Sequence, residues 1–330
     1  MNLSEVRELA TNALIGAGAR PEAAASVARS TYLAERDGIR SHGLLYVPIY
    51  ADHVKCGKVD GQAIPEIDKP KPSIVIADAK SGFAHAAIDA AWGDFTEAAR
   101  SQGLAVLTVH HSYNCGVLGH HAQRLAEEGF LGLCFTHAPA SIAPPGASGP
   151  VIGTNPFAFA VPDGQGDTLI SVDQSASVVA KSEILLRARN NEPIDPSWAN
   201  DADGNPTSDA NAALKGSMAP AGGYKGFGTG MLAEVLASCL AGALLSKDAS
   251  PFAGTAGGPP GTGQCFMAFN PDTFSGSYFY QQTQRLAELI SEQEGAHLAG
   301  QKAKRNRVVN EIEGVLVPEE LVEQIKGYNA

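Results

Sequence analysis

Ser41-His42-Gly43 is the first group in the chain that could carry acid–base chemistry. An imidazole changes its charge near neutral pH, so His42 could give or take a proton during a reaction. The hydroxyl of Ser41 could orient the ring, and Gly43 would let another group approach the backbone closely. A loop histidine bonded only to backbone is the competing interpretation, and it is the more common situation.

A second candidate region alternates apolar runs with polar, glycine-bearing loops. Ala105–Val109 predicts a strand, residues 110–119 form a loop, and His120–Glu128 predicts a helix. Further along, Gly153-Thr154-Asn155-Pro156 precedes a strand predicted at Phe157–Val161. Because loops that end on strands hold ligands in open α/β folds, this region predicts a cleft for a nucleotide and a substrate.

The elements around this region alternate in type. Two helices come first, one capped by Ser4 and one beginning at Pro21, and the Pro- and Gly-rich segment Gly57–Pro72 predicts a connection. From residue 73 onward strands alternate with helices such as Ala84–Gln102, which predicts an α/β sheet covered on both faces.

The second half of the chain is less regular. Arg189–Ala219 is polar and rich in turn residues, so we expect a surface excursion that could act as a lid. Gly226–Leu245 predicts an apolar helix, and helices return from Phe279 onward.

Composition and charge restrict the kind of partner. The chain has 330 residues, 44% hydrophobic and 18% charged, as in ordinary globular proteins. A formal net charge of -11 argues against nucleic acid and anionic membrane as partners, because both require clustered cations. No long apolar run and no secretory signal pattern are present, so we expect a cytoplasmic protein that acts on a small molecule.

Two glycine patterns lack the residues that phosphate binding requires. Gly258–Gly263 has the spacing of a P-loop, but Gln264 and Cys265 stand where Lys and Ser/Thr are needed. Gly226-Phe227-Gly228 lacks a third glycine and no strand precedes it, so a Rossmann fingerprint is absent.

The histidine pairs His110-His111 and His120-His121 raise the question of a metal. Adjacent side chains on a strand or helix diverge, and no H-E-x-x-H or Cys/His ligand spacing is present. We therefore expect no metal. Cys115 lies in the candidate loop, but no motif pairs it with a base, so we do not expect it to be a nucleophile.

Five motifs, in order, resemble the malate/L-lactate dehydrogenase-like family, whose fold is unrelated to that of the Rossmann lactate dehydrogenases. The motifs are Ser41-His42-Gly43, Ser112-Tyr113-Asn114-Cys115-Gly116-Val117-Leu118-Gly119, Gly153-Thr154-Asn155-Pro156, Asp173-Gln174-Ser175-Ala176-Ser177 and Gly222-Gly223-Tyr224-Lys225-Gly226. The resemblance covers nearly the whole chain. Within the family, the second and fourth motifs are most similar to those of Δ1-pyrroline-2-carboxylate/Δ1-piperideine-2-carboxylate reductases.

The resemblance implies a mixed-sheet, non-Rossmann α/β fold and a homodimer with the active site near the subunit contact. It also implies two units. Residues 1–70 and 279–330 would form a helical unit for substrate and dimer contacts, and residues 71–278 would form the cofactor-binding α/β unit.

Roles carry over from the family residue by residue. His42 would be the proton donor, Ser41 its relay partner and Glu183 the relay carboxylate, at a position where we expect Asp. Thr154 would contact the substrate. The cofactor would be held by Asn114, Cys115, Gly116, Val117, Leu118, Asp173, Gln174, Ser175, Tyr224 and Lys225, with Gly300, Gln301, Lys302, Lys304 and Arg305 closing over its adenosine end. Because the last three are cations that could bind a ribose 2′-phosphate, NADPH is favoured over NADH; a solvated charged helix face is the alternative.

Two departures from the family pattern bear on the substrate. The family places an Arg three residues after the Gly of Ser-His-Gly, where it would pair a substrate carboxylate, but here that residue is Tyr46. A phenol gives one hydrogen bond where a guanidinium gives a charged fork. Asn114 stands where the hydroxyacid dehydrogenases of the family carry His, which favours the imine reductases.

The resemblance therefore implies an NAD(P)H-dependent oxidoreductase that reduces a cyclic imine carboxylate to L-proline or L-pipecolate. Three alternatives stay open: a 2-hydroxyacid dehydrogenase of the malate, lactate, ureidoglycolate or sulfolactate type, a cofactor-binding protein without catalysis, and a metal-dependent hydrolase that uses the paired histidines.

Overall fold

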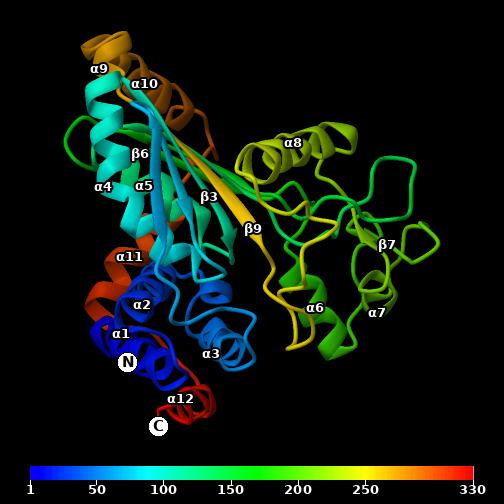
Figure 1. Ribbon diagram of the computed structural model, residues 1–330. Coiled ribbons are helices and arrows are strands. Elements are labelled where there is room, and N and C mark those ends of the chain that lie inside the picture. Colours follow the sequence, from blue (N-terminus) through cyan, green and yellow to red (C-terminus); the bar gives the residue numbers. More distant parts are fainter. Residues whose placement is uncertain (330) are drawn as a thin grey trace.

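A computed structural model, which describes residues 1–329, has a seven-stranded mixed sheet at its centre (Figure 1). The strand order is β1-β2-β3-β9-β4-β5-β6, and only the β2–β3 pair is parallel. The strands are β1 (Glu66–Lys71), β2 (Ile74–Asp78), β3 (Leu104–Ser112), β4 (Leu131–Thr136), β5 (Phe157–Pro162), β6 (Thr168–Gln174) and β9 (Thr262–Phe269), with a separate pair β7 (Ala199–Asn200) and β8 (Ser217–Met218). The predicted mixed-sheet α/β class is confirmed.

Twelve α-helices surround the sheet in the described residues. They are α1 (Leu3–Gly16), α2 (Pro21–Arg36), α3 (Val47–Lys55), α4 (Ala84–Gln102), α5 (Leu118–Glu127), α6 (Lys181–Asn190), α7 (Ala210–Ala213), α8 (Tyr224–Glu234), α9 (Pro271–Phe274), α10 (Ser277–Ser291), α11 (Gln301–Glu313) and α12 (Glu319–Lys326). Short turns η1 (Arg40–His42) and η2 (Leu44–Tyr46) are 3-10 helices, and η3 (Val235–Leu240) is a π-helix.

One face of the sheet is fully covered. Helices α4 and α5 pack on it with apolar side chains such as Phe95 and Leu125, which meet Leu107 and Phe266 from the strands in the largest core cluster. The bounds predicted for α4 match the structure, because Gly103 ends the helix in a left-handed conformation (φ 83°).

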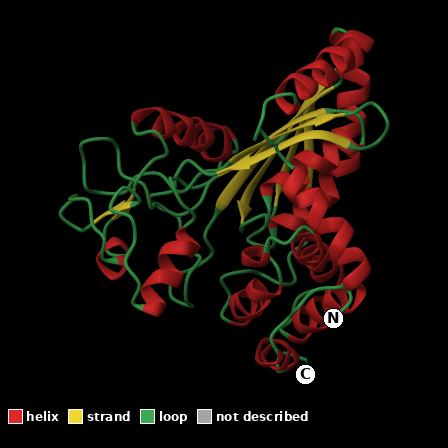
Figure 2. Cartoon of the chain, turned by 180° about the vertical axis from the view of Figure 1, so that it is seen from behind, coloured by secondary structure: helices red, strands yellow, loops and turns green. Residues whose placement is uncertain are grey.

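The opposite face is covered only in part, whereas the sequence predicts cover on both faces. Helix α8 and η3 pack there against Phe135 and Cys265. Val106, Leu133 and Met267 of the same face remain partly buried. Figure 2 shows most of the helices on one side of the strands and, on the other, long loops with α6, α7 and α8 among them.

The N-terminal helices pack with the C-terminal ones below the sheet (Figure 1). Helix α1 begins at Leu3 because Asn2, and not Ser4 as predicted, accepts the Glu5 N–H in a capping box. Helix α2 begins at Pro21 as predicted.

Three sequence predictions are corrected. The connection predicted at residues 57–72 contains edge strand β1, whose polar residues and Pro70 hide it from a search for apolar runs. Arg189–Ala219 is not all surface, because Ile194, Ala199 and Met218 join a buried cluster with α6 and α7. The helix predicted at 226–245 runs from Tyr224 to Leu240 and includes the π-turn η3.

The predicted division into two units stays a prediction. Strand β1 spans its boundary at residue 70 and pairs with β2 in the sheet. Helices α11 and α12 pack with the N-terminal helices, whereas α10 lies beside α9 at the far end of the sheet (Figure 1). Within residues 1–329, no helix combines the length and the apolar character that crossing a membrane demands.

Candidate functional site

The Ser41–His42 pair lies on η1, immediately after α2. The Ser41 Oγ is 3.0 Å from the His42 Nδ1. Gly43 has an ordinary backbone conformation, but a Cβ there would lie 2.1 Å from the Glu35 Oε1, which accepts the Leu44 N–H at 2.8 Å. The close approach predicted for Gly43 is thus made by Glu35, and it fixes the turn that presents His42.

His42 is exposed on η1, and the Tyr46 ring lies on one side of it. Burial lowers the pKa of His42 below its ordinary value, and repulsion from the nearby imidazole of His120 lowers it further. A lowered pKa favours the neutral imidazole and makes the protonated form of His42 the better proton donor.

A charge network behind His42 was not predicted. The His120 Nε2 is 3.2 Å from the Asp37 Oδ2, and Asp37 also binds the guanidinium groups of Arg36 and Arg307. Burial alone would raise the pKa of Asp37, but hydrogen bonds from His120, Arg307 and Arg36 outweigh burial and hold it well below its usual range. Because Asp37 and His120 are 83 residues apart, only the fold reveals their contact.

An aromatic group forms the side of the site next to His42. The Tyr46 ring stacks on His42 with centroids 6.4 Å apart and an interplanar angle of 6°, and its edge meets Tyr50 at 4.7 Å. Burial raises the pKa of Tyr46 to about 12, so the phenol stays protonated. The Asn114 Oδ1 accepts the Tyr50 hydroxyl at 2.8 Å, and its Nδ2 lies 3.4 Å from the Tyr46 hydroxyl. The structure thus brings His42, Tyr46 and Asn114 together.

The predicted cofactor loop, residues 114–118, leads into the start of α5. Gly116 has φ 72°, and a Cβ there would lie 2.4 Å from the Ser30 Oγ. The Gly119 N–H donates to the Asp173 Oδ2 at 2.7 Å, which joins the loop to the end of β6. Burial raises the pKa of the Cys115 thiol to about 12, which disfavours the reactive thiolate.

The predicted adenosine end lies farther along β6. Gly300 packs on Ser171 at the start of α11, and the backbone of Ala299 accepts the Ser171 N–H at 3.2 Å. A small pocket of about 20 Å³ is lined there by Gln123, Ser171, Gly300 and Lys304. Lys304 binds the Asp167 Oδ2 at 2.7 Å, so its charge is already paired. Lys302 and Arg305 are exposed on α11.

Other predicted residues are not joined to His42. Glu183 lies on α6 and pairs with Arg187 at 3.0 Å; among residues 1–329 no hydrogen bond links it to Ser41 or His42. Tyr224 and Lys225 begin α8, and Tyr224 is 72% exposed. The Thr154 backbone accepts the Ala176 N–H at 2.8 Å, which holds it beside the residues that follow β6.

Comparisons with known proteins identify the family of this chain. The family model for malate/L-lactate dehydrogenase matches residues 1–326. A (2R)-3-sulfolactate dehydrogenase (NADP(+)) of Chromohalobacter salexigens is 37% identical over 99% of this chain and 97% of its own. A Δ1-pyrroline-2-carboxylate reductase of Ancylobacter novellus is 34% identical over 99% of this chain and 96% of its own.

Among solved structures, a Δ1-piperideine-2-carboxylate reductase of Pseudomonas syringae superimposes with a TM-score of 0.93 at 30% identity, covering 99% of each chain. The sequence motifs, the mixed sheet and these similarities lead to one family. The chain belongs to the malate/L-lactate dehydrogenase family of NAD(P)-dependent oxidoreductases.

Proposed function

We propose that the protein reduces a cyclic imine carboxylate, Δ1-pyrroline-2-carboxylate or Δ1-piperideine-2-carboxylate, to L-proline or L-pipecolate with NADPH. The observation that carries the proposal is the Ser41–His42 pair. Ser41 holds the Nδ1 at 3.0 Å, and no group among residues 1–329 is bonded to the Nε2, which is left for a substrate. Several relatives of 32–35% identity carry imine reductase names.

The residues present fit a nicotinamide nucleotide. The loop at Gly116 packs closely on Ser30, α5 presents its N-terminal end beside that loop, and a small pocket of about 20 Å³ lies at Gly300. When bound, the reduced nicotinamide supplies a hydride to the imine carbon.

The chain's own groups manage the proton and the orientation. His42, once protonated, gives the Nε2 proton to the imine nitrogen. The C=N double bond becomes a C–N single bond as the C–H and N–H bonds form, and His42 is left neutral. Ser41 fixes the ring through its Nδ1. Tyr46, protonated because its pKa is about 12, offers one hydrogen bond to the substrate carboxylate.

Glu183 needs a rearrangement to act as a relay carboxylate. Its carboxylate is bonded to Arg187, so the relay requires that this pair opens. For cofactor choice, the pairing of Lys304 with Asp167 leaves Lys302 and Arg305 as the cations for a 2′-phosphate. Replacing both by Ala should raise the KM for NADPH and leave that for NADH unchanged.

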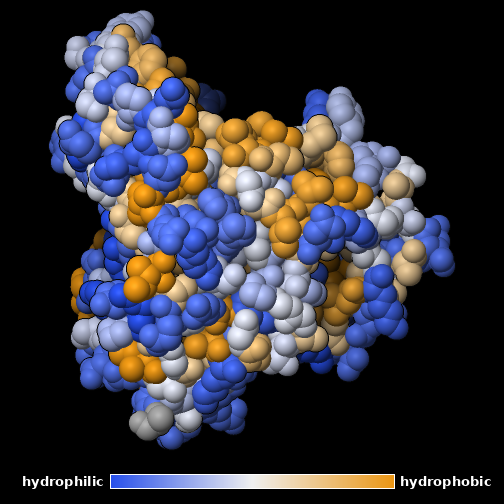
Figure 3. Space-filling view, in the orientation of Figure 1, coloured by the Kyte–Doolittle hydropathy of each residue, from blue (hydrophilic) through white to orange (hydrophobic). Residues whose placement is uncertain are grey.

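We further propose a homodimer in the cytoplasm. Exposed apolar side chains gather over α8 and η3, among them Met231, Leu232, Val235 and Leu240, next to the partly covered sheet face (Figure 3). An apolar area of this kind supports an interface between copies. The five unpaired cysteines support a reducing compartment.

The test is NADPH oxidation with the two cyclic imines. His42→Asn should lower turnover by about 10²-fold or more while NADPH binding, measured by fluorescence titration, stays near that of the parent enzyme. Tyr46→Arg should lower the KM for the carboxylate substrate, because a guanidinium replaces a single phenol donor. Full turnover in His42→Asn would remove His42 from the reaction.

A second candidate is oxidation of a sulfonated 2-hydroxyacid, because a relative named (2R)-3-sulfolactate dehydrogenase is 37% identical. Parallel assays of (2R)-3-sulfolactate with NADP⁺ separate the two. Activity with sulfolactate alone would replace the imine proposal, and activity with the imines alone would support it.

A further inference from the structure

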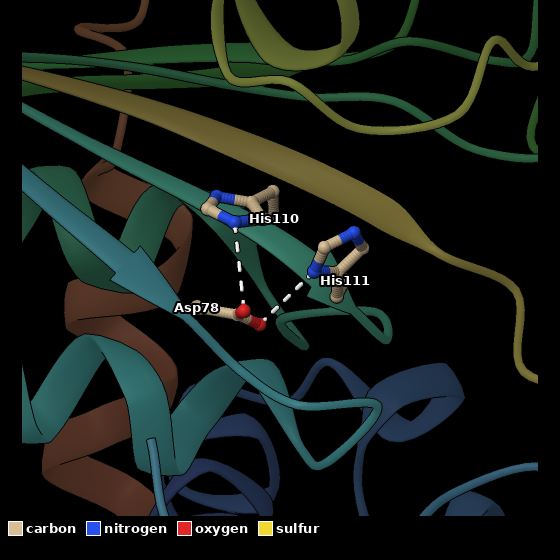
Figure 4. Close-up of side chains that lie close together, drawn as sticks. All are labelled: Asp78, His110 and His111. Atoms are coloured by element: carbon tan, nitrogen blue, oxygen red, sulfur yellow. Dashed lines mark hydrogen bonds and ion pairs between the residues drawn. The ribbon is translucent and has the colours of Figure 1, made fainter. Parts of the chain in front are cut away.

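Three potential metal ligands meet where β2 and β3 end. The His111 Nδ1 is 3.1 Å from the Asp78 Oδ1, and the His110 Nε2 is 3.8 Å from the Asp78 Oδ2 (Figure 4). All three ligand atoms lie within 4.8 Å of one another. The cluster is separate from the groups assigned to His42 and the cofactor, and the proposed reaction does not use it.

The backbone explains why two adjacent histidines reach one carboxylate. Asp78 and His110 are register neighbours on parallel strands, so their side chains lie side by side. His111 has φ 45°, in the left-handed region, and this turn swings its ring back towards Asp78 instead of away from it. The prediction that adjacent histidines diverge is therefore wrong for this pair, because it assumed a regular strand.

The turn facing the cluster is strained as well. Lys80 and Ser81 have φ 52° and 62°, and the Ser81 N–H donates to the His111 carbonyl at 2.8 Å. Three of the five non-glycine residues with positive φ in the described chain thus belong to this one place. Backbone strain of this kind persists where surrounding structure enforces it, and it concentrates at functional sites.

We propose that Asp78, His110 and His111 bind a divalent transition metal, with Zn²⁺ the best fit. Two imidazoles and one carboxylate form a ligand set typical of zinc sites. At Zn–ligand distances of about 2.0–2.1 Å, tetrahedral geometry places ligands about 3.3 Å apart. The two carboxylate–imidazole distances, each to a different oxygen of Asp78, lie on either side of that value. All three ligand atoms are within 4.8 Å of one another, so the ligands would move closer together to bind an ion.

The fourth position would be open to water. The His111 side chain is 55% exposed, and the other two ligands are partly buried beneath it. The ion would fasten the ends of β2 and β3 just before Ser112, where the loop to Asn114 begins. It would act on the stability of this loop and not on the reacting atoms.

Lys80 is the competitor for the site. Its Nζ is 3.2 Å from the Asp78 Oδ2 and 2.8 Å from the Glu66 Oε2 on the neighbouring strand. The lysine side chain is 41% exposed, so it can leave Asp78 and keep its contact with Glu66. Because the Lys80 ammonium must be displaced, it weakens metal binding. Removing this charge should therefore strengthen metal binding, whereas removing a ligand should weaken it.

The experiment uses the untagged full chain after chelator treatment. Zn²⁺ is titrated by calorimetry, and Co²⁺ is titrated with visible absorption as a report on coordination. We expect one Zn²⁺ per chain, a rise in Tm on binding, and the intense visible bands of four-coordinate Co²⁺.

Asp78→Asn and His111→Asn should each weaken Zn²⁺ binding by at least about tenfold, whereas Lys80→Gln should strengthen it. His297→Asn, at an exposed histidine outside the cluster, is the matched control and should change nothing. His111→Gly removes the ligand while accepting the backbone conformation, so it should lose binding without loss of folding. Unchanged Zn²⁺ affinity in the Asp78 and His111 variants, or Co²⁺ bands that survive them, would overturn the proposal.

Discussion

The two histidine pairs look alike in the sequence and differ in nearly every physical respect. His110 and His111 end a strand, are partly exposed, and converge on Asp78. His120 and His121 lie in the first turn of α5, are buried, and diverge. The His120 Nε2 binds Asp37, whereas the His121 Nε2 lies 2.9 Å from the Cys115 carbonyl.

The difference teaches that backbone conformation decides whether two adjacent side chains can contact the same partner. Successive residues of a helix point about 100° apart, so the α5 pair must serve two surroundings. The positive φ of His111 reverses the alternation that a strand would impose. The Asp37 carboxylate contacts His120 and two arginines in the interior, whereas the Asp78 carboxylate contacts His110 and His111 nearer the surface.

The largest contrast should appear when each carboxylate is neutralised. Asp37→Asn leaves the half-buried guanidinium groups of Arg36 and Arg307 without a countercharge, so we expect a loss of about 3 kcal/mol in the free energy of unfolding. Asp78→Asn should cost about 1 kcal/mol or less, because its partners are partly exposed. Urea denaturation of both variants measures the difference, and equal losses would contradict the contrast.

The loss of stability at low pH should depend on the Asp37 carboxylate. The pKa of Asp37 is lowered in the folded protein, so its stabilisation is present above the unfolded pKa of about 3.9 and is lost as the pH falls towards the folded pKa. Below pH 3.9 the unfolded chain binds one more proton at this site, which costs about 1.4 kcal/mol per pH unit.

The free energy of unfolding, measured by denaturation at a series of pH values from 5 to 3, should therefore fall more steeply with decreasing pH for the parent protein than for Asp37→Asn. Asp78→Asn is a weaker control, because the pKa of Asp78 is also lowered, with burial opposing the hydrogen bonds from Lys80 and His111. If the free energy of unfolding depends on pH equally in the parent and in Asp37→Asn, groups other than Asp37 cause the loss of stability in acid.

A sequence can indicate Ser41–His42 because the two residues are adjacent on a tight turn and Gly43 follows them. It can also indicate α4, whose apolar periodicity ends at Gly103. It could not indicate the contact of Asp37 with His120, because two residues 83 positions apart leave no local signal of their contact. The convergence of His110 and His111 was hidden for another reason, since it depends on one φ angle that side-chain periodicity does not encode.

The pKa of His42, the proposed proton donor, should depend on His120 and not on His121. Repulsion from His120 contributes to the lowered pKa of His42, after burial, so His120→Asn should raise it towards 6.5. In the reduction direction, kcat/KM falls as the pH rises through the pKa of His42, so the midpoint of that fall should move to higher pH. His121→Asn is the matched control, and the same midpoint in both variants would show that His120 has no such effect.

The smallest effect concerns the backbone alone. At His111, with φ 45°, Gly should be about 1 kcal/mol more stable than Ala, because a Cβ is strained in the left-handed region. At His121, inside α5, the order should reverse, since Gly costs roughly 0.5–1 kcal/mol relative to Ala in a helix. Each Ala/Gly pair removes the same imidazole, so lost contacts cancel and only the backbone term remains.

Thermal and urea unfolding of the four variants would measure both differences. If the Ala variant is more stable than the Gly variant at both positions, residue 111 adopts an ordinary strand conformation. In that conformation the His110 and His111 rings would have no backbone reason to meet at Asp78.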